Sequence, residues 1–86
     1  MAAVSSQAMG EKEYAVVLFH STQAAIKAER VLVRAGFAVK LIPTPRQLSS
    51  DCGTALRCAW ADADAVIAAL QAAQVEYDSV HKLSAS

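Results

Sequence analysis

The sequence is short of glycine, histidine, cysteine and net charge, and each shortage argues against a class of protein. Its three glycines lie too far apart to form a phosphate-binding P-loop or a dinucleotide-binding fingerprint. Eight Lys and Arg residues balance eight Asp and Glu residues, so we expect no general affinity for nucleic acid or for anionic membranes. No apolar run approaches the roughly 18 residues of a transmembrane helix. The N-terminus lacks the basic cluster and apolar stretch of a signal peptide, which makes the cytoplasm the expected location.

The chain has 86 residues, of which 55% are hydrophobic and 19% charged. This composition excludes intrinsic disorder, and the length suits one small domain. Residues 1–12 show no periodicity, so we expect a frayed arm there, a single domain over 13–83 and a frayed tail over 84–86.

Apolar patterning predicts six elements in the order β-α-β-β-α-β, with strands at 14–20, 37–42, 54–60 and 75–81 and helices at 23–35 and 63–73. Ser21 or Thr22 is expected to cap the first helix and Asp62 the second, and Gly36 suits the left-handed residue that ends a helix. The first helix should bury a stripe made of Ala24, Ala28, Val31, Leu32 and Ala35, and the second a stripe made of Val66, Ile67, Leu70 and Ala73.

This order predicts an α+β fold of the ferredoxin-like, split βαβ type. Strands separated by a helix favour parallel neighbours, so the expected sheet is four-stranded and mixed, with both helices on one face. The other face would be uncovered, and the last strand would offer Val75, Tyr77 and Val80 to a partner. Exposed apolar patches on small domains usually find a partner, so we expect a homodimer.

Residues with metal-binding or acid-base chemistry are few. His20, His81, Cys52 and Cys58 show none of the spacings of a zinc site, so no metal or other cofactor is expected. Asp62 and Asp64 are accounted for by helix capping. In a reducing compartment the two cysteines should be free thiols.

The segment Pro43–Arg57 is the most unusual part of the chain. Gly53 permits a positive φ and close approach to the Cys52 sulfur, while Arg46 and Arg57 can stabilise a thiolate. Asp51 opposes this, because a neighbouring carboxylate raises the pKa of a thiol. From the residues alone, Cys52 is therefore either a reactive thiol or an inert loop cysteine.

Cys58 has a different context, because Leu56, Cys58 and Trp60 would share one face of the third strand. A free cysteine on a core face behaves as a small hydrophobic residue. We therefore expect Cys58 to belong to the core.

The strings Leu18-Phe19-His20-Ser21-Thr22, Leu41-Ile42-Pro43-Thr44-Pro45-Arg46 and Ser49-Ser50-Asp51-Cys52-Gly53, with Ala55-Leu56-Arg57 after them, resemble the putative selenium/sulfur carrier family of small bacterial proteins. The resemblance spans about Tyr14 to Lys82. It implies that Cys52 holds sulfur or selenium as a persulfide or selenosulfide. Arg46, Ser49, Gly53 and Arg57 match the motif around it.

The expected function is thus a carrier without turnover of its own. It would take the chalcogen from a cysteine desulfurase or a selenium donor and pass it to an acceptor enzyme. The alternative is a non-catalytic module that binds a ligand or a protein through the Pro43–Arg57 loop. In that alternative Cys52 is only a packing residue.

Overall fold

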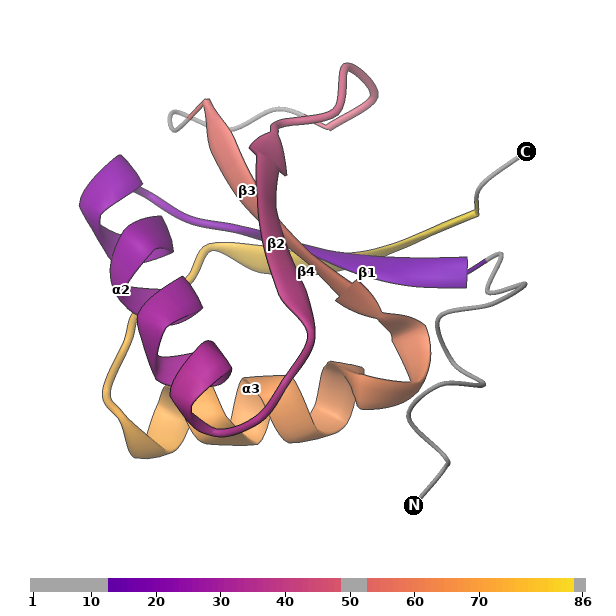
Figure 1. Ribbon diagram of the computed structural model, residues 1–86. Helices are drawn as coiled ribbons and strands as arrows, with labels where there is room; N and C mark the ends of the chain where they lie inside the picture. The colour runs from indigo at the N-terminus through magenta and orange to yellow at the C-terminus, as the bar shows by residue number, and fades with distance from the viewer. Residues whose placement is uncertain (1–12, 49–52, 85–86) are drawn as a thin grey trace.

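The computed structural model describes residues 13–48 and 53–84. Their elements follow the order β1 (Glu13–Leu18), α2 (Thr22–Arg34), β2 (Val39–Pro43), β3 (Thr54–Ala59), the short 3-10 helix η1 (Trp60–Asp62), α3 (Ala63–Ala72) and β4 (Ser79–Ser84). The predicted alternation of strands and helices is confirmed, and the fold is α+β. Figure 1 shows a sheet with α2 and α3 together on one side of it. The expected arm at 1–12 lies outside the described residues, and β4 reaches Ser84, one residue past the expected domain end.

The four strands form one sheet in the order β2-β3-β1-β4, and every neighbouring pair is antiparallel. The prediction of a mixed sheet was therefore wrong. Each helix does connect two strands that point in the same direction, but a third strand of opposite direction lies between them: β3 separates β1 from β2, and β1 separates β3 from β4. Local patterning identifies a strand but does not say which strand hydrogen-bonds beside it, and this explains the error.

Helix α2 begins and ends as its sequence indicates. The Ser21 hydroxyl accepts a hydrogen bond from the Ala24 amide at 3.2 Å, which satisfies one of the free amides of the first turn. Gly36 follows the helix with φ +94°, a left-handed conformation that favours glycine. The buried stripe is Ala25, Ala28 and Leu32, with Ala24 and Val31 half-buried beside it. Ala35, predicted to be buried, is exposed.

The start of α3 differs from the prediction. Trp60 does not extend β3 but opens η1, and it is 38% exposed instead of facing the core. Asp62 precedes α3 with no side-chain hydrogen bond to it, so the predicted cap is not formed. The predicted apolar stripe of α3 is confirmed, since Val66 and Leu70 are fully buried and Ile67 and Ala73 pack beside them.

The last strand begins four residues later than predicted. Val75 continues from α3, where its amide donates to the Leu70 carbonyl at 2.9 Å, and the Asp78 amide then reaches the Leu18 carbonyl at 2.6 Å. Only from Ser79 does the chain pair with β1. Val75, Tyr77 and Val80 pack against the core on the helix side of the sheet, so they do not form the exposed patch expected on the uncovered face.

The main core lies between the sheet and the two helices. Alternating strand residues face the helices, among them Ala15, Val17, Leu56 and Cys58. The opposite face, here called the open face because neither helix covers it, has a smaller cluster built on Val16, Leu18 and Ala55. Leu48, from the loop between β2 and β3, packs against this smaller cluster.

Candidate functional site

The loop between β2 and β3 contains most of the predicted site, and its two ends are held together. Pro43 and Thr54 are register partners, and the Thr44 amide donates to the Gly53 carbonyl at 3.0 Å. The hydrogen bond between Thr44 and Gly53 extends the hairpin by one residue beyond each strand. The loop therefore leaves the sheet and returns to it at adjacent points.

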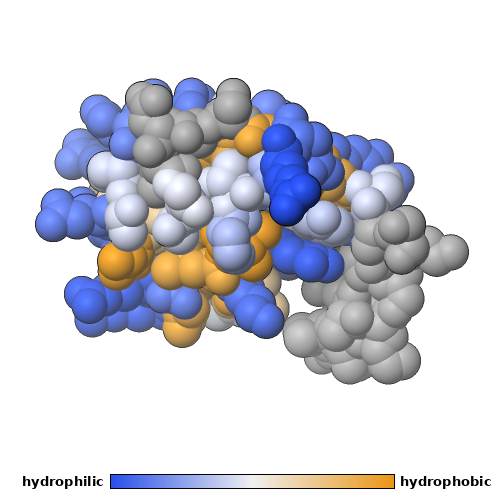
Figure 2. Space-filling model, turned by 90° about the horizontal axis from the view of Figure 1, so that it is seen from above, coloured by the Kyte–Doolittle hydropathy of each residue, from blue (hydrophilic) through white to orange (hydrophobic). Residues whose placement is uncertain are grey.

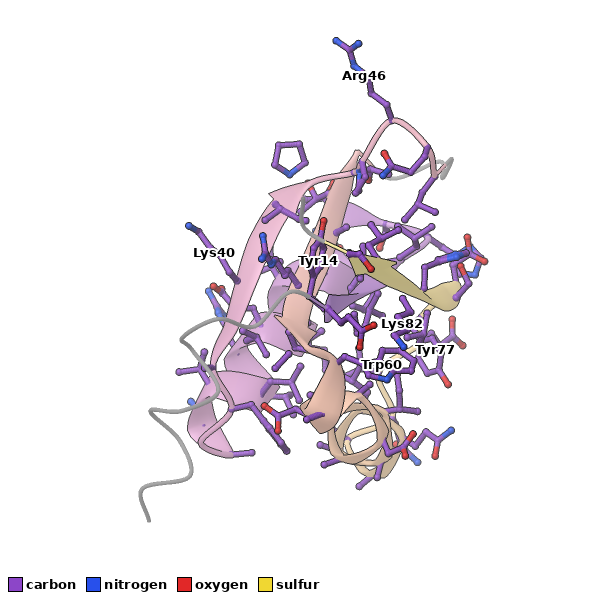
Figure 3. All side chains as sticks on the ribbon, turned by 90° about the vertical axis from the view of Figure 1, so that its right-hand side faces the viewer. Tyr14, Lys40, Arg46, Trp60, Tyr77 and Lys82 are labelled. Atoms are coloured by element: carbon purple, nitrogen blue, oxygen red, sulfur yellow. The ribbon has the colours of Figure 1, made fainter. Side chains whose placement is uncertain are left out.

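The first half of this loop is a tight turn. The Leu48 amide donates to the Pro45 carbonyl at 3.0 Å, which closes a four-residue turn with Arg46 and Gln47 at its two central positions. Leu48 is half-buried and packs on the open face, while Arg46 is exposed. Figure 3 shows the Arg46 side chain pointing away from the sheet into solvent. An exposed guanidinium at the tip of a turn is accessible to a binding partner.

Two predicted site residues, Cys52 and Ser49, lie outside the described residues. Gly53 is described and exposed, and it does not use the positive φ that a glycine permits. An added Cβ at Gly53 would meet nothing within 4 Å. The space around this Cβ position is therefore open, whereas the predicted approach to the Cys52 sulfur lies outside the described residues.

Arg57 lies in β3 on the open face, where Val16 and Lys40 are its two register partners. Its guanidinium carbon lies 3.9 Å from the centre of the Tyr14 ring, a cation–π contact. In Figure 3, Tyr14 is near the middle of the sheet and Arg46 is at the far tip of the loop. The structure therefore does not bring Arg46 and Arg57 together. Arg46 would act at the tip of the loop, and Arg57 on the open face of the sheet.

Cys58 is 3% exposed and belongs to the core, as predicted. Its register partners in the sheet are Ala15 and Val39. Burial raises the pKa of the Cys58 thiol to about 11, and the negative charge of Asp62 adds to the shift. At neutral pH this thiol is protonated, and a protonated thiol is a poor nucleophile.

The described residues offer no other site of obvious chemistry. They contain no group of three or more His, Cys, Asp and Glu residues that could hold a metal ion. The His81 Nε2 atom lies 2.9 Å from the Ser79 hydroxyl, and His20 is exposed. No helix in 13–48 or 53–84 is both long and apolar enough to cross a membrane.

Sequence reasoning missed the neighbours of Arg57. Lys40 and Tyr14 lie on the same open face and come from the two strands on either side of β3. The alternation of each strand places these residues on a face. Only the sheet register shows that the three side chains are neighbours.

Residues 13–82 match a protein family whose description is "Putative Se/S carrier protein-like". The match covers all of the described elements except the end of β4. No curated protein and no solved structure matches the chain.

Proposed function

Because the chain belongs to the family described as Putative Se/S carrier protein-like, we propose that it carries a sulfur or selenium atom on Cys52. The family match over 13–82 is the observation that carries this proposal. The atom would be held as a persulfide or selenosulfide, received from a donor enzyme and handed to an acceptor. The chain would have no turnover of its own.

The state of Cys58 supports the choice of Cys52. The sequence contains two cysteines, and Cys58 is buried with a pKa of about 11. Sulfur transfer needs an accessible thiolate, which Cys58 does not provide at neutral pH. Cys52 is then the thiol left to accept the chalcogen.

The proposed step is a thiol exchange. The Cys52 thiolate attacks the outer sulfur of a donor persulfide, as formed on a cysteine desulfurase. A new S–S bond forms at Cys52 while the S–S bond of the donor breaks, and the donor cysteine leaves as a thiolate. The transferred sulfur keeps its oxidation state, because it moves from one persulfide to another without an external oxidant or reductant. A nucleophile of the acceptor then takes the outer sulfur and regenerates the Cys52 thiolate.

The other motif residues have proposed supporting roles. Gly53 lets the donor approach, since nothing lies within 4 Å of the place a Cβ would occupy. Arg46 and Arg57 would stabilise the anion or the partner that delivers it, and Ser49 would complete the loop.

The proposal also includes a cytoplasmic location, a homodimer and a ferredoxin-like fold. The split of each β-α-β unit by a third strand supports the fold assignment. Light scattering tests the homodimer, which should have twice the chain mass of 9.1 kDa.

Mass spectrometry after incubation with a cysteine desulfurase and cysteine tests the carrier. We expect a gain of about 32 Da, one sulfur atom, on the peptide that contains Cys52. Cys52→Ser should abolish the gain, and Cys58→Ala should retain it, because alanine suits the core position. Arg46→Ala and Arg57→Ala should slow the gain without abolishing it.

Two outcomes would contradict this proposal, the first its choice of Cys52 and the second the carrier function itself. Loading that persists in Cys52→Ser and disappears in Cys58→Ala would show that the two thiols are assigned the wrong way round. If no variant and no wild-type protein gains sulfur, the Pro43–Arg57 loop is better explained as part of a binding module.

A further inference from the structure

Two positive side chains face each other on the open face of the sheet. Lys40 in β2 and Arg57 in β3 are register partners, and both are exposed. Like charges directly opposite each other in an antiparallel pair destabilise the sheet. The pairing of Lys40 with Arg57 therefore does not itself stabilise the sheet, and a ligand with negative groups would offset the repulsion.

No carboxylate of the described strands offsets these charges. The strand residues on this face include no Asp or Glu, as the alternation of β1, β2, β3 and β4 shows. The one ion pair among the described residues, Lys82 with Glu13 at 3.4 Å, uses side chains of the other face. His81 lies in the same row as Arg57, beyond Val16. The row therefore contains the two basic side chains of Lys40 and Arg57 and, beyond Val16, the imidazole of His81.

Arg57 is held in place before any ligand arrives. Its guanidinium lies over the Tyr14 ring, with 3.9 Å between the guanidinium carbon and the ring centre. A guanidinium in contact with a ring through its face retains N–H groups at its rim, and these can donate two parallel hydrogen bonds to a carboxylate. Less side-chain freedom is then lost on binding.

The surface next to these charges is partly apolar. Ile42, Leu48 and Leu83 are half-buried around the small cluster of the open face. Figure 2, seen from above, shows hydrophobic areas set between hydrophilic ones. A ligand that fits this surface has negative groups with apolar groups among them. A segment of protein with alternating acidic and apolar side chains has this chemistry, whereas nucleic acid would call for a net positive domain, and this chain has none.

We propose that Lys40 and Arg57, with Tyr14 beneath Arg57, form a docking surface for an acidic, partly apolar segment of a partner protein. The carboxylates of the segment pair with the two cations, and its apolar side chains contact Ile42 and Leu48. Figure 3 shows Lys40 on the outer side of the sheet, clear of the helices. This surface does not need Cys52, so it goes beyond the carrier function.

A nuclear magnetic resonance titration with a synthetic peptide of alternating Glu and Leu tests the proposal. Amide signals of β1, β2 and β3 around Tyr14, Lys40 and Arg57 should shift. The double variant Lys40→Gln/Arg57→Gln should bind about tenfold more weakly, and wild-type binding should weaken with salt. The matched control is Lys27→Gln/Arg30→Gln, which removes the same charge from exposed positions of α2 and should leave affinity within about twofold. Amide spectra of each variant establish that it is folded, and Arg57→Lys, which keeps the charge, should retain part of the affinity.

Three results would overturn the docking surface. The two double variants could lose affinity equally, the shifts could fall on α2, or a single-stranded oligonucleotide could bind this face more tightly than the peptide. Cys52→Ser separates the two proposals, because it should bind the peptide like wild type while it fails to load sulfur. Wild-type protein that binds the peptide but gains no sulfur would contradict the carrier alone. Wild-type protein that gains sulfur but does not bind the peptide would contradict the docking surface alone.

Discussion

The Lys82 ammonium lies 5.1 Å from the centre of the Trp60 ring, and it also lies 3.4 Å from a carboxylate oxygen of Glu13. Trp60 follows β3, while Lys82 and Glu13 are near the ends of β4 and β1. The Lys82 side chain therefore connects β4 to Glu13 of β1 and to Trp60, the residue that follows β3. Trp60, which opens η1 and is 38% exposed, thus contacts a cation at the edge of the sheet and does not belong to the core.

A double-mutant cycle should find a weak coupling between Trp60 and Lys82. Trp60→Leu and Lys82→Gln should show a coupling of about 0.5–1 kcal/mol in the free energy of unfolding, typical of an exposed cation–π pair. The measurement is denaturant unfolding of the wild type, both single variants and the double variant.

A second double-mutant cycle, of Lys82→Gln with Glu13→Gln, measures the coupling within the ion pair for comparison with the cation–π pair. Both side chains of this ion pair are nearly half exposed, at 44% and 49%, so its coupling should be below ~1 kcal/mol and should fall with salt. A coupling of more than about 2 kcal/mol in either cycle would show a desolvated contact that the structure does not contain.

Burial of Cys58 should make the protein less stable in alkaline solution. The pKa of this thiol is about 11 in the folded chain, whereas the ordinary pKa of a cysteine thiol is 9.0. The folded state therefore keeps a proton that the unfolded state loses, and stability falls as pH rises through this window. A shift of this size corresponds to a loss of ~2–3 kcal/mol.

Cys58→Ala removes this thiol alone, so a comparison with wild type isolates its contribution. The difference in unfolding free energy between wild type and Cys58→Ala should be constant at neutral pH and should change in favour of the variant as pH rises from about 9 to about 11. A difference that does not depend on pH would show that the folded state does not hold this proton more tightly than the unfolded state.

Sequence reasoning found the features that depend on neighbours in the chain. The Ser21 cap, the left-handed Gly36 and the burial of Val66 and Leu70 each rest on local spacing, and each is confirmed. The Asp62 cap failed because η1 precedes α3, and Asp62 has helical φ and ψ instead of the extended conformation of a typical cap.

Features that depend on distant parts of the chain could not be predicted. The apolar pattern predicted a last strand from Val75 to His81 with a slip in alternation between Tyr77 and Val80, whereas β4 begins at Ser79. The loop at 44–53 separates Lys40 from Arg57, and its length leaves the register of β2 and β3 unspecified by sequence. The contact between Arg57 and Tyr14 therefore could not be predicted from the sequence. The predictions for Cys52 and Ser49 lie outside the described residues.

Replacement of the Cys58 thiol by a hydroxyl should destabilise the protein. In Cys58→Ser the hydroxyl would be placed among apolar residues of the core, at a cost of about 1–3 kcal/mol if no partner accepts its hydrogen bond. Cys52→Ser, a change in the loop, should alter stability by less than ~0.5 kcal/mol. Thermal unfolding of both variants gives the comparison, and equal losses would contradict the assignment of Cys58 as the core cysteine.

The two described glycines form a matched pair that separates backbone strain from crowding. An added Cβ meets nothing within 4 Å at either Gly36 or Gly53, but only Gly36 has a positive φ, at +94°. Gly36→Ala should therefore lose about 1–2 kcal/mol, because a side chain at Cβ makes the left-handed region unfavourable. Gly53→Ala should stay within about 0.5 kcal/mol of wild type. Denaturant unfolding measures the stability of both variants.

The same two variants also test the proposed role of Gly53 in sulfur loading. If Gly53 serves close approach of a sulfur donor, Gly53→Ala should slow the loading of Cys52, while Gly36→Ala, once folded, should not. Equal loading rates in the two variants would mean that Gly53 has no part in admitting the donor.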